Sequence, residues 1–141
     1  MKIGIIVYSK TGKTLSAAKK LKEALLSSGN YVLLEQVTTA GDDLSKVAAA
    51  PGTEGYDAVI LASPVWGLSV ASVMKLYLDK IPSLKGQKVG LLVTRSFWGG
   101  KGAIKQMAKV CQAKGGTVTK TGILSTSGDN VKKLVEDFKS L

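Results

Sequence analysis

Short apolar runs alternate with segments of helical periodicity along this chain, and this alternation limits the possible folds more than any other feature. The first of five such runs is rich in β-branched residues, as a strand buried on both faces is, and all five are expected to be strands. They cover residues 2–8, 31–37, 56–62, 88–94 and 117–124. Strands that alternate with helices form a parallel sheet with right-handed crossovers. The pattern therefore predicts an α/β fold, and the length of 141 residues fits a single domain over residues 1–141.

Apolar residues at intervals of three and four predict the helices between these strands. The expected core faces are Leu15, Ala18, Leu21 and Leu25; Val70, Val73, Met74, Tyr77 and Ile81; Ile104, Met107, Ala108 and Cys111; and Val131, Leu134, Val135 and Phe138. Gly29 ends the first helix, Pro82 ends the second, and Asp129 can cap the last. In the polar segment 38–55 we expect Leu44 and Val47 on a short helix. Glu35 and Gln36 interrupt the second strand, which is therefore expected at an edge.

The segment after the first strand contains only small, hydroxylated or basic residues: Ser9, Lys10, Thr11, Gly12, Lys13 and Thr14. Unpaired N–H groups and the positive dipole end at a helix N-terminus attract a phosphate. Hydroxyl groups can donate further bonds, and Gly12 can adopt a positive φ. The segment ends like a Walker A loop, but Val7 stands where that motif needs glycine, and G-x-G-x-x-G is absent. An ordinary capped turn remains the alternative.

Two further loops follow the third and fourth strands. One is Ser63-Pro64-Val65-Trp66-Gly67, where Pro64 keeps Ser63 out of helical geometry. The other follows Thr94 and reads Arg95-Ser96-Phe97-Trp98-Gly99-Gly100. Ligands of open parallel sheets bind at the carboxyl ends of strands, where the strand order reverses. In the order 2-1-3-4-5 that point lies between the first and third strands, so the three loops predict one shared site.

The chain resembles flavodoxins over essentially its whole length. Three motifs carry the resemblance: residues 9–14, Tyr56-Asp57 leading to 63–67, and 84–89 leading to Phe97-Trp98-Gly99. The resemblance implies a flavodoxin-like three-layer sandwich, with a five-stranded parallel sheet in the order 2-1-3-4-5 and helices on both faces. It also implies noncovalently bound FMN.

The same resemblance implies the roles of the loop residues. Residues 9–14 would hold the phosphate, and Ser63 and its neighbours would contact the ribityl chain and one edge of the ring. Trp66 would pack against one face of the flavin and Trp98 or Phe97 against the other, where offset stacking adds to burial; either tryptophan could instead anchor the core. Gly67 would permit a peptide flip beside the flavin. The residues expected to contact FMN are Ser9, Lys10, Thr11, Gly12, Lys13, Thr14, Ser63, Pro64, Val65, Trp66, Gly67, Thr94, Arg95, Ser96, Phe97, Trp98 and Gly99.

The net charge of +10 departs from the family, whose members are usually acidic. Lys10, Lys13, Arg95 and Lys101 lie on or beside the loops, whereas residues 63–69 and 94–102 include no Asp or Glu. Cations stabilise the anionic reduced flavin, so we expect a hydroquinone couple less negative than in an acidic flavodoxin. We also expect redox partner proteins with acidic docking surfaces. The alternative is that these charges are solvated and distant from the flavin. No dense basic run with interleaved aromatic residues occurs, so nucleic acid is not an expected partner.

The remaining composition narrows the chemistry. The chain has no histidine, which excludes histidine-dependent catalysis and histidine metal ligands. One cysteine cannot build a thiolate metal site, and Cys111 falls on an apolar helix face. No signal peptide precedes the first strand, and no apolar run approaches the roughly 20 residues of a membrane helix. We therefore expect a cytoplasmic protein without a membrane partner.

Three functions are consistent with these features. The first is an FMN electron carrier, in which the cofactor supplies the redox chemistry and the protein sets potential and access. The second is a small FMN-dependent NAD(P)H or quinone oxidoreductase on the same fold. The third is a flavin-free binding module, because fold does not fix function. The short loop over 95–100 favours the carrier.

Overall fold

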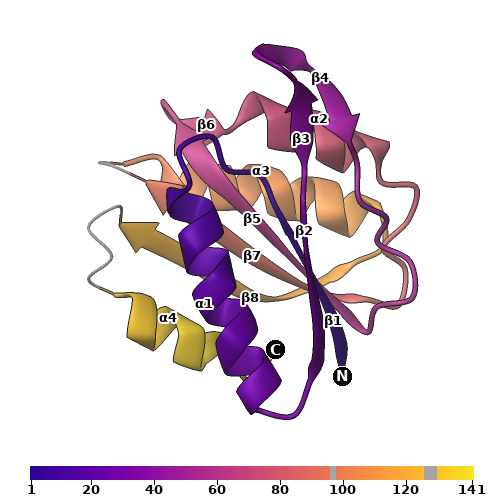
Figure 1. The fold of residues 1–141 in the computed structure, drawn as a ribbon. Helices are drawn as coiled ribbons and strands as arrows, with labels where there is room; N and C mark the ends of the chain where they lie inside the picture. Colours follow the sequence, from indigo (N-terminus) through magenta and orange to yellow (C-terminus); the bar gives the residue numbers. More distant parts are fainter. Residues whose placement is uncertain (96–97, 126–129) are drawn as a thin grey trace.

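A five-stranded parallel sheet runs through the centre of the molecule (Figure 1). The computed structural model describes residues 1–95, 98–125 and 130–141. The strands are β1 (Lys2–Val7), β2 (Tyr31–Gln36), β5 (Ala58–Trp66), β7 (Lys88–Arg95) and β8 (Thr117–Ser125), in the order β2-β1-β5-β7-β8. This order confirms the predicted 2-1-3-4-5 arrangement and places β2 at an edge.

Helices cover both faces of the sheet, as the continuous apolar runs predict. On one face lie α1 (Lys13–Ser27) and α4 (Val131–Phe138); on the other lie α2 (Ser72–Lys80) and α3 (Gly100–Ala113) (Figure 1). Successive strand side chains point to opposite faces. Ile60 therefore packs with the α1 and α4 side chains, whereas Val59 and Leu61 pack with those of α2 and α3. Both halves of the core are thus apolar.

A β-hairpin replaces the short helix that was expected around Leu44 and Val47. It consists of β3 (Thr38–Ala40) and β4 (Asp43–Ala49), which pair antiparallel with shifts of register. A regular strand would turn residues three apart to opposite faces, but the bulged pairing lets both Leu44 and Val47 pack against the core. A spacing of three residues is also typical of one face of a helix, and the prediction of a short helix here was wrong.

The segment 63–66 is strand rather than loop. β5 continues beside β7 as far as the pair Pro64 and Thr94, and then pairs antiparallel with β6 (Ser69–Val70). Only the turn after Trp66 leaves the strand, and Gly67 makes it possible with a φ of 64°. Val70 consequently belongs to β6, and α2 begins at Ser72 rather than at the expected Val70.

The other predicted helices occur near their expected positions. Met107 and Cys111 are buried on α3, and Leu134 and Phe138 are buried on α4. The expected cap Asp129 lies outside the described residues. None of the helices in the described ranges is long and apolar enough to cross a membrane.

Candidate functional site

The loop between β1 and α1 lines a pocket at the start of the helix. Gly12 directly precedes α1 with a φ of 92°, a conformation that favours glycine. Its N–H donates to the hydroxyl of Ser9 at 3.0 Å, which closes the loop. No side chain of the described residues caps the first turn of α1. The first-turn N–H groups therefore remain available to an anion.

A buried hydrogen bond joins this helix start to the end of β7. The hydroxyl oxygens of Thr14 and Thr94 are 2.7 Å apart, and the two residues are 1% and 4% exposed. Two hydroxyls carry two protons, and their mutual bond uses one of them. The other proton can be donated to a ligand, because both residues line the pocket.

The pocket lies where β1, β5 and β7 end and has a volume of about 240 Å³. Its lining consists of Lys10, Thr11, Lys13, Thr14, Pro64, Val65, Trp66, Thr94 and Arg95. All nine belong to the predicted site, so the structure brings the three distant segments together. Three of them are cationic and none is acidic. The pocket therefore has the donors and the charge to hold a phosphate.

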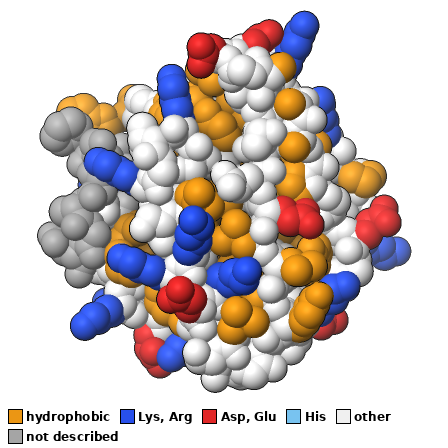
Figure 2. Space-filling model, in the orientation of Figure 1, with side chains coloured by type: hydrophobic (Ala, Val, Ile, Leu, Met, Phe, Trp, Pro, Cys, Tyr) orange, Lys and Arg blue, Asp and Glu red, His pale blue; other side chains and the backbone are white. Residues whose placement is uncertain are grey.

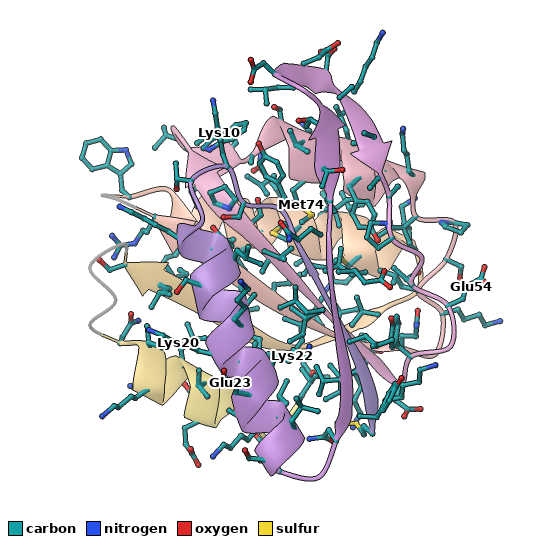
Figure 3. All side chains as sticks on the ribbon, viewed as in Figure 1. Lys10, Lys20, Lys22, Glu23, Glu54 and Met74 are labelled. Atoms are coloured by element: carbon teal, nitrogen blue, oxygen red, sulfur yellow. The ribbon has the colours of Figure 1, made fainter. Side chains whose placement is uncertain are left out.

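Trp66 forms one wall of this pocket. Its ring meets Tyr8 edge-on, with centroids 5.6 Å apart and an angle of 82° between the planes. The ammonium of Lys10 lies 5.9 Å from the centroid of the indole ring. Figure 3 labels Lys10 on the loop before α1, beside the ends of β5 and β6. Contact with Tyr8 restricts the indole, which gives the pocket an aromatic wall.

Among the hollows lined by described residues, Trp98 borders a different one from Trp66. It is 70% exposed and lines a neighbouring hollow of about 420 Å³, together with Arg95 and Lys101. Arg95 borders both hollows, so they adjoin. Among the described residues, Trp66 is therefore the one aromatic wall of this pocket. Ser96 and Phe97 lie outside the described residues.

Three other predicted residues lie at the margin of the site. The side chain of Ser63 is buried and donates to the carbonyl of Pro64 at 3.0 Å, so it does not line the pocket. Gly99 adopts a φ of 92°, and a Cβ on it would lie 2.8 Å from the carbonyl oxygen of Gly67. The two glycines thus let the turn after β5 pack directly against the start of α3.

Sequence reasoning missed Tyr8 and the hollow behind it. Burial raises the pKa of Tyr8 above its ordinary value. Together with Lys10, it also lines a second hollow of about 390 Å³ between the end of β2 and the β3–β4 hairpin. An aromatic residue directly before the 9–14 loop was the available signal, but the hairpin that closes the hollow was expected to be a helix.

The donor set of the pocket fits FMN. Free N–H groups at the helix start, threonine hydroxyls and three cations suit its phosphate, and an indole wall suits its ring. The pocket volume lies below the roughly 300–1,000 Å³ usual for a small-molecule site. If FMN binds here, Lys13, Thr14 and Thr94 would hold its phosphate, and Trp66 would offer its ring an aromatic wall.

Comparison with known proteins agrees with this geometry. The chain is 28% identical over 137 residues to the flavodoxin of Megasphaera elsdenii, covering 95% of this chain and 93% of the relative. The solution structure of that flavodoxin in its two-electron-reduced form matches with a TM-score of 0.73, at 26% identity over 99% of each chain. Oxidised flavodoxin 2 from Bacillus cereus matches with a TM-score of 0.77, at 20% identity over 99% of this chain and 96% of the other, and shows the fold alone.

These matches and the site define a flavoprotein of the flavodoxin-like class. The model of the NADPH-dependent FMN reductase family matches residues 1–130, and the chain belongs to this family. The predicted resemblance, the fold class and FMN as the cofactor are confirmed. Which of the predicted residues contact FMN stays a prediction.

Proposed function

We propose that this protein binds FMN noncovalently and passes electrons through it between redox partners. The observation that carries the proposal is the pocket at the meeting point of β1, β5 and β7, which combines an uncapped helix start, three cations and the Trp66 wall. When bound, FMN supplies one- and two-electron redox chemistry. The chain's own residues bind, orient and tune it.

Each part of the pocket has a distinct task in this proposal. The N–H groups of the first turn of α1, with Lys13 and the surplus proton of the Thr14–Thr94 pair, hold the phosphate. Trp66, backed by Tyr8, fixes the plane of the ring. Lys10 and Arg95 place positive charge beside it, which favours the anionic reduced form and raises the potential relative to an acidic flavodoxin.

A second candidate function is an NADPH-dependent reductase, which the family match favours. Such an enzyme oxidises NADPH without any added reductase, whereas a carrier does not. The net charge of +10 further leads us to propose acidic redox partners. We propose the cytoplasm as the site of action, because a reducing compartment suits a chain with a single cysteine.

The test begins with the absorption spectrum of the purified protein and titration of the flavin-free protein with FMN. We expect a flavin spectrum, and we expect Trp66→Ala to weaken FMN binding by about 1–3 kcal/mol, or about 5- to 150-fold. Tyr31→Ala is the matched control, because this exposed aromatic begins β2 at the opposite end of the sheet. A protein that takes up no FMN would contradict the proposal. NADPH oxidation by the loaded protein alone would favour the reductase.

A further inference from the structure

The positive charge of this chain is concentrated in one continuous segment. From Lys80 to Gly128, both included, the sequence contains nine Lys or Arg and no Asp or Glu. The rest of the chain, with eleven basic and ten acidic residues, is almost neutral. The charged segment forms β7, α3 and β8, so the net charge of the protein belongs mainly to one side of the fold.

On α3 this charge forms a regular stripe. Lys101, Lys105 and Lys109 are exposed, whereas Ala103, Met107 and Cys111 face the core. Residues four apart lie on one helix face, so the three ammonium groups follow a line of about 12 Å along the axis. Within the described residues none of the three forms an ion pair. We call these three lysines the α3 face.

The α3 face begins at the rim of the candidate flavin site. Gly99 directly precedes α3, and a Cβ on it would lie 3.1 Å from the Cα of Leu68. Leu68 is 67% exposed and Trp98 is 70% exposed. Two large apolar side chains, Leu68 and Trp98, are therefore exposed to solvent near Lys101, the first lysine of the stripe. The hollow of about 420 Å³ beside Trp98 is bordered by Arg95 and Lys101, so it is cationic as well.

Other basic helices lack this arrangement. On α1, Glu23 accompanies Lys20 and Lys22 (Figure 3), and α4 carries Glu136 and Asp137 among its lysines. Figure 2 accordingly shows red and blue side chains intermixed on the face that includes α1. Among the described residues of the strands and the helix that pack against α3, the acidic residue is Asp79, near the end of α2. It lies at the far end of α3, where the ammonium of Lys114 binds the Asp79 carbonyl.

We propose that the α3 face, together with Trp98 and Leu68, is the surface on which an acidic redox protein docks. The inference rests on the proposed function, because it supplies the partner of the same flavin site. Protein interfaces combine an apolar centre with a polar rim, and opposite charges steer the encounter. Here the apolar centre adjoins the flavin site, which keeps the electron path short. The lysine stripe alone would suit a nucleic acid, which has no need of the exposed apolar pair at the start of the stripe. The combination of the two therefore favours a protein.

The test uses a reduced plant-type [2Fe–2S] ferredoxin as an acidic one-electron donor. Two transfers, with one proton taken from solvent, reduce the bound flavin to its anionic form and leave two ferredoxins oxidised. The variant is the triple charge reversal Lys101→Glu, Lys105→Glu and Lys109→Glu. The matched control reverses the exposed Lys19, Lys132 and Lys133 on α1 and α4, which changes the net charge equally. FMN affinity and reduction by neutral photoreduced deazariboflavin serve as checks that each site is intact.

At low salt we expect the α3 variant to accept electrons from ferredoxin at least tenfold more slowly than the wild type, and the control less than threefold more slowly. Salt should slow the wild type at least tenfold between 10 mM and 0.5 M but barely affect the α3 variant. Leu68→Ser should slow transfer several-fold even at high salt, because an apolar contact is not screened. Equal losses in variant and control would overturn the proposal, since they would show that only net charge matters.

A protein that binds no FMN would contradict the proposed function, and docking would then be tested without electron transfer. Oxidised ferredoxin would then be titrated into the flavin-free protein by calorimetry, and weaker binding by the α3 variant alone would still support the docking surface. No difference between the α3 variant and the control would overturn it. A single-stranded DNA 20-mer that bound through the same lysines more tightly than ferredoxin at equal salt would also overturn it.

Discussion

Replacing the two threonines that meet at the pocket with valine, one at a time and together, should separate the stability of the site from its ligand affinity. Thr14 and Thr94 share a hydrogen bond of 2.7 Å, and both are almost completely buried. Valine keeps the shape of threonine and has a methyl group in place of the hydroxyl. The double-mutant cycle of Thr14→Val and Thr94→Val therefore tests the bond itself.

The structure sets the expected magnitudes. Either single change leaves the other hydroxyl buried without its partner, which costs about 1–3 kcal/mol of the free energy of unfolding. The double change leaves no orphaned hydroxyl and should cost less than the sum of the singles by at least about 1 kcal/mol. FMN affinity should follow the opposite pattern. Each single variant keeps one hydroxyl proton for the ligand, whereas the double variant keeps none and should bind FMN about 5- to 15-fold more weakly.

Urea unfolding of the flavin-free variants and FMN titration give the two readouts. Thr119→Val is the control, because Thr119 is exposed on the edge strand β8 and should change stability by less than about 0.5 kcal/mol. Additive losses in the double variant would show that the hydroxyls do not depend on each other. Unchanged FMN affinity in the double variant would refute the role of the surplus proton.

Three further outcomes follow from single residues. Gly99→Ala should cost about 2–4 kcal/mol of the free energy of unfolding, because the new Cβ would meet backbone atoms and the residue has a positive φ. Gly67→Ala should cost about 1 kcal/mol, because its φ is also positive but its Cβ would meet no atom within 4 Å. Equal losses in the two variants would contradict the role of the backbone contact at Gly99. Lys114→Met should cost about 1 kcal/mol in a urea melt, because the ammonium binds the carbonyls of Asp79 and Ile81; the exposed Lys109→Met should be neutral. Burial, opposed by Lys114, raises the pKa of the Cys111 thiol from 9.0 to about 11. The contribution of the protonated thiol to the free energy of unfolding is therefore complete below pH 9 and is lost as pH rises through about 11. Over that range, urea melts of the wild type should show a loss about 2 kcal/mol larger than melts of Cys111→Ala.

The sequence predicted most of the sheet because each strand is a local feature. Runs such as 56–62 and 88–94 are apolar on both faces, and only a sheet covered by helices on both sides buries such strands. The loop over 9–14 could also be predicted, because its small, hydroxylated and basic residues directly follow a strand and precede a helix. The errors fell where pairing decided the outcome. Leu44 and Val47 have helical spacing, and nothing local reveals a bulged partner strand.

The site divides in the same way. All nine residues that line the pocket could be selected from the sequence, because chain order places the carboxyl ends of their strands, and the loop after β1, at one edge of a parallel sheet. Contacts between side chains from these separate segments could not be selected. Only the tertiary structure decided that Thr14 bonds to Thr94, that Tyr8 backs Trp66, and that Trp98 lies exposed in a separate hollow. Periodicity and local composition report only on residues that are near one another in the chain. The contacts of the site join residues tens of positions apart, and only the packing of the core determines the distances between them.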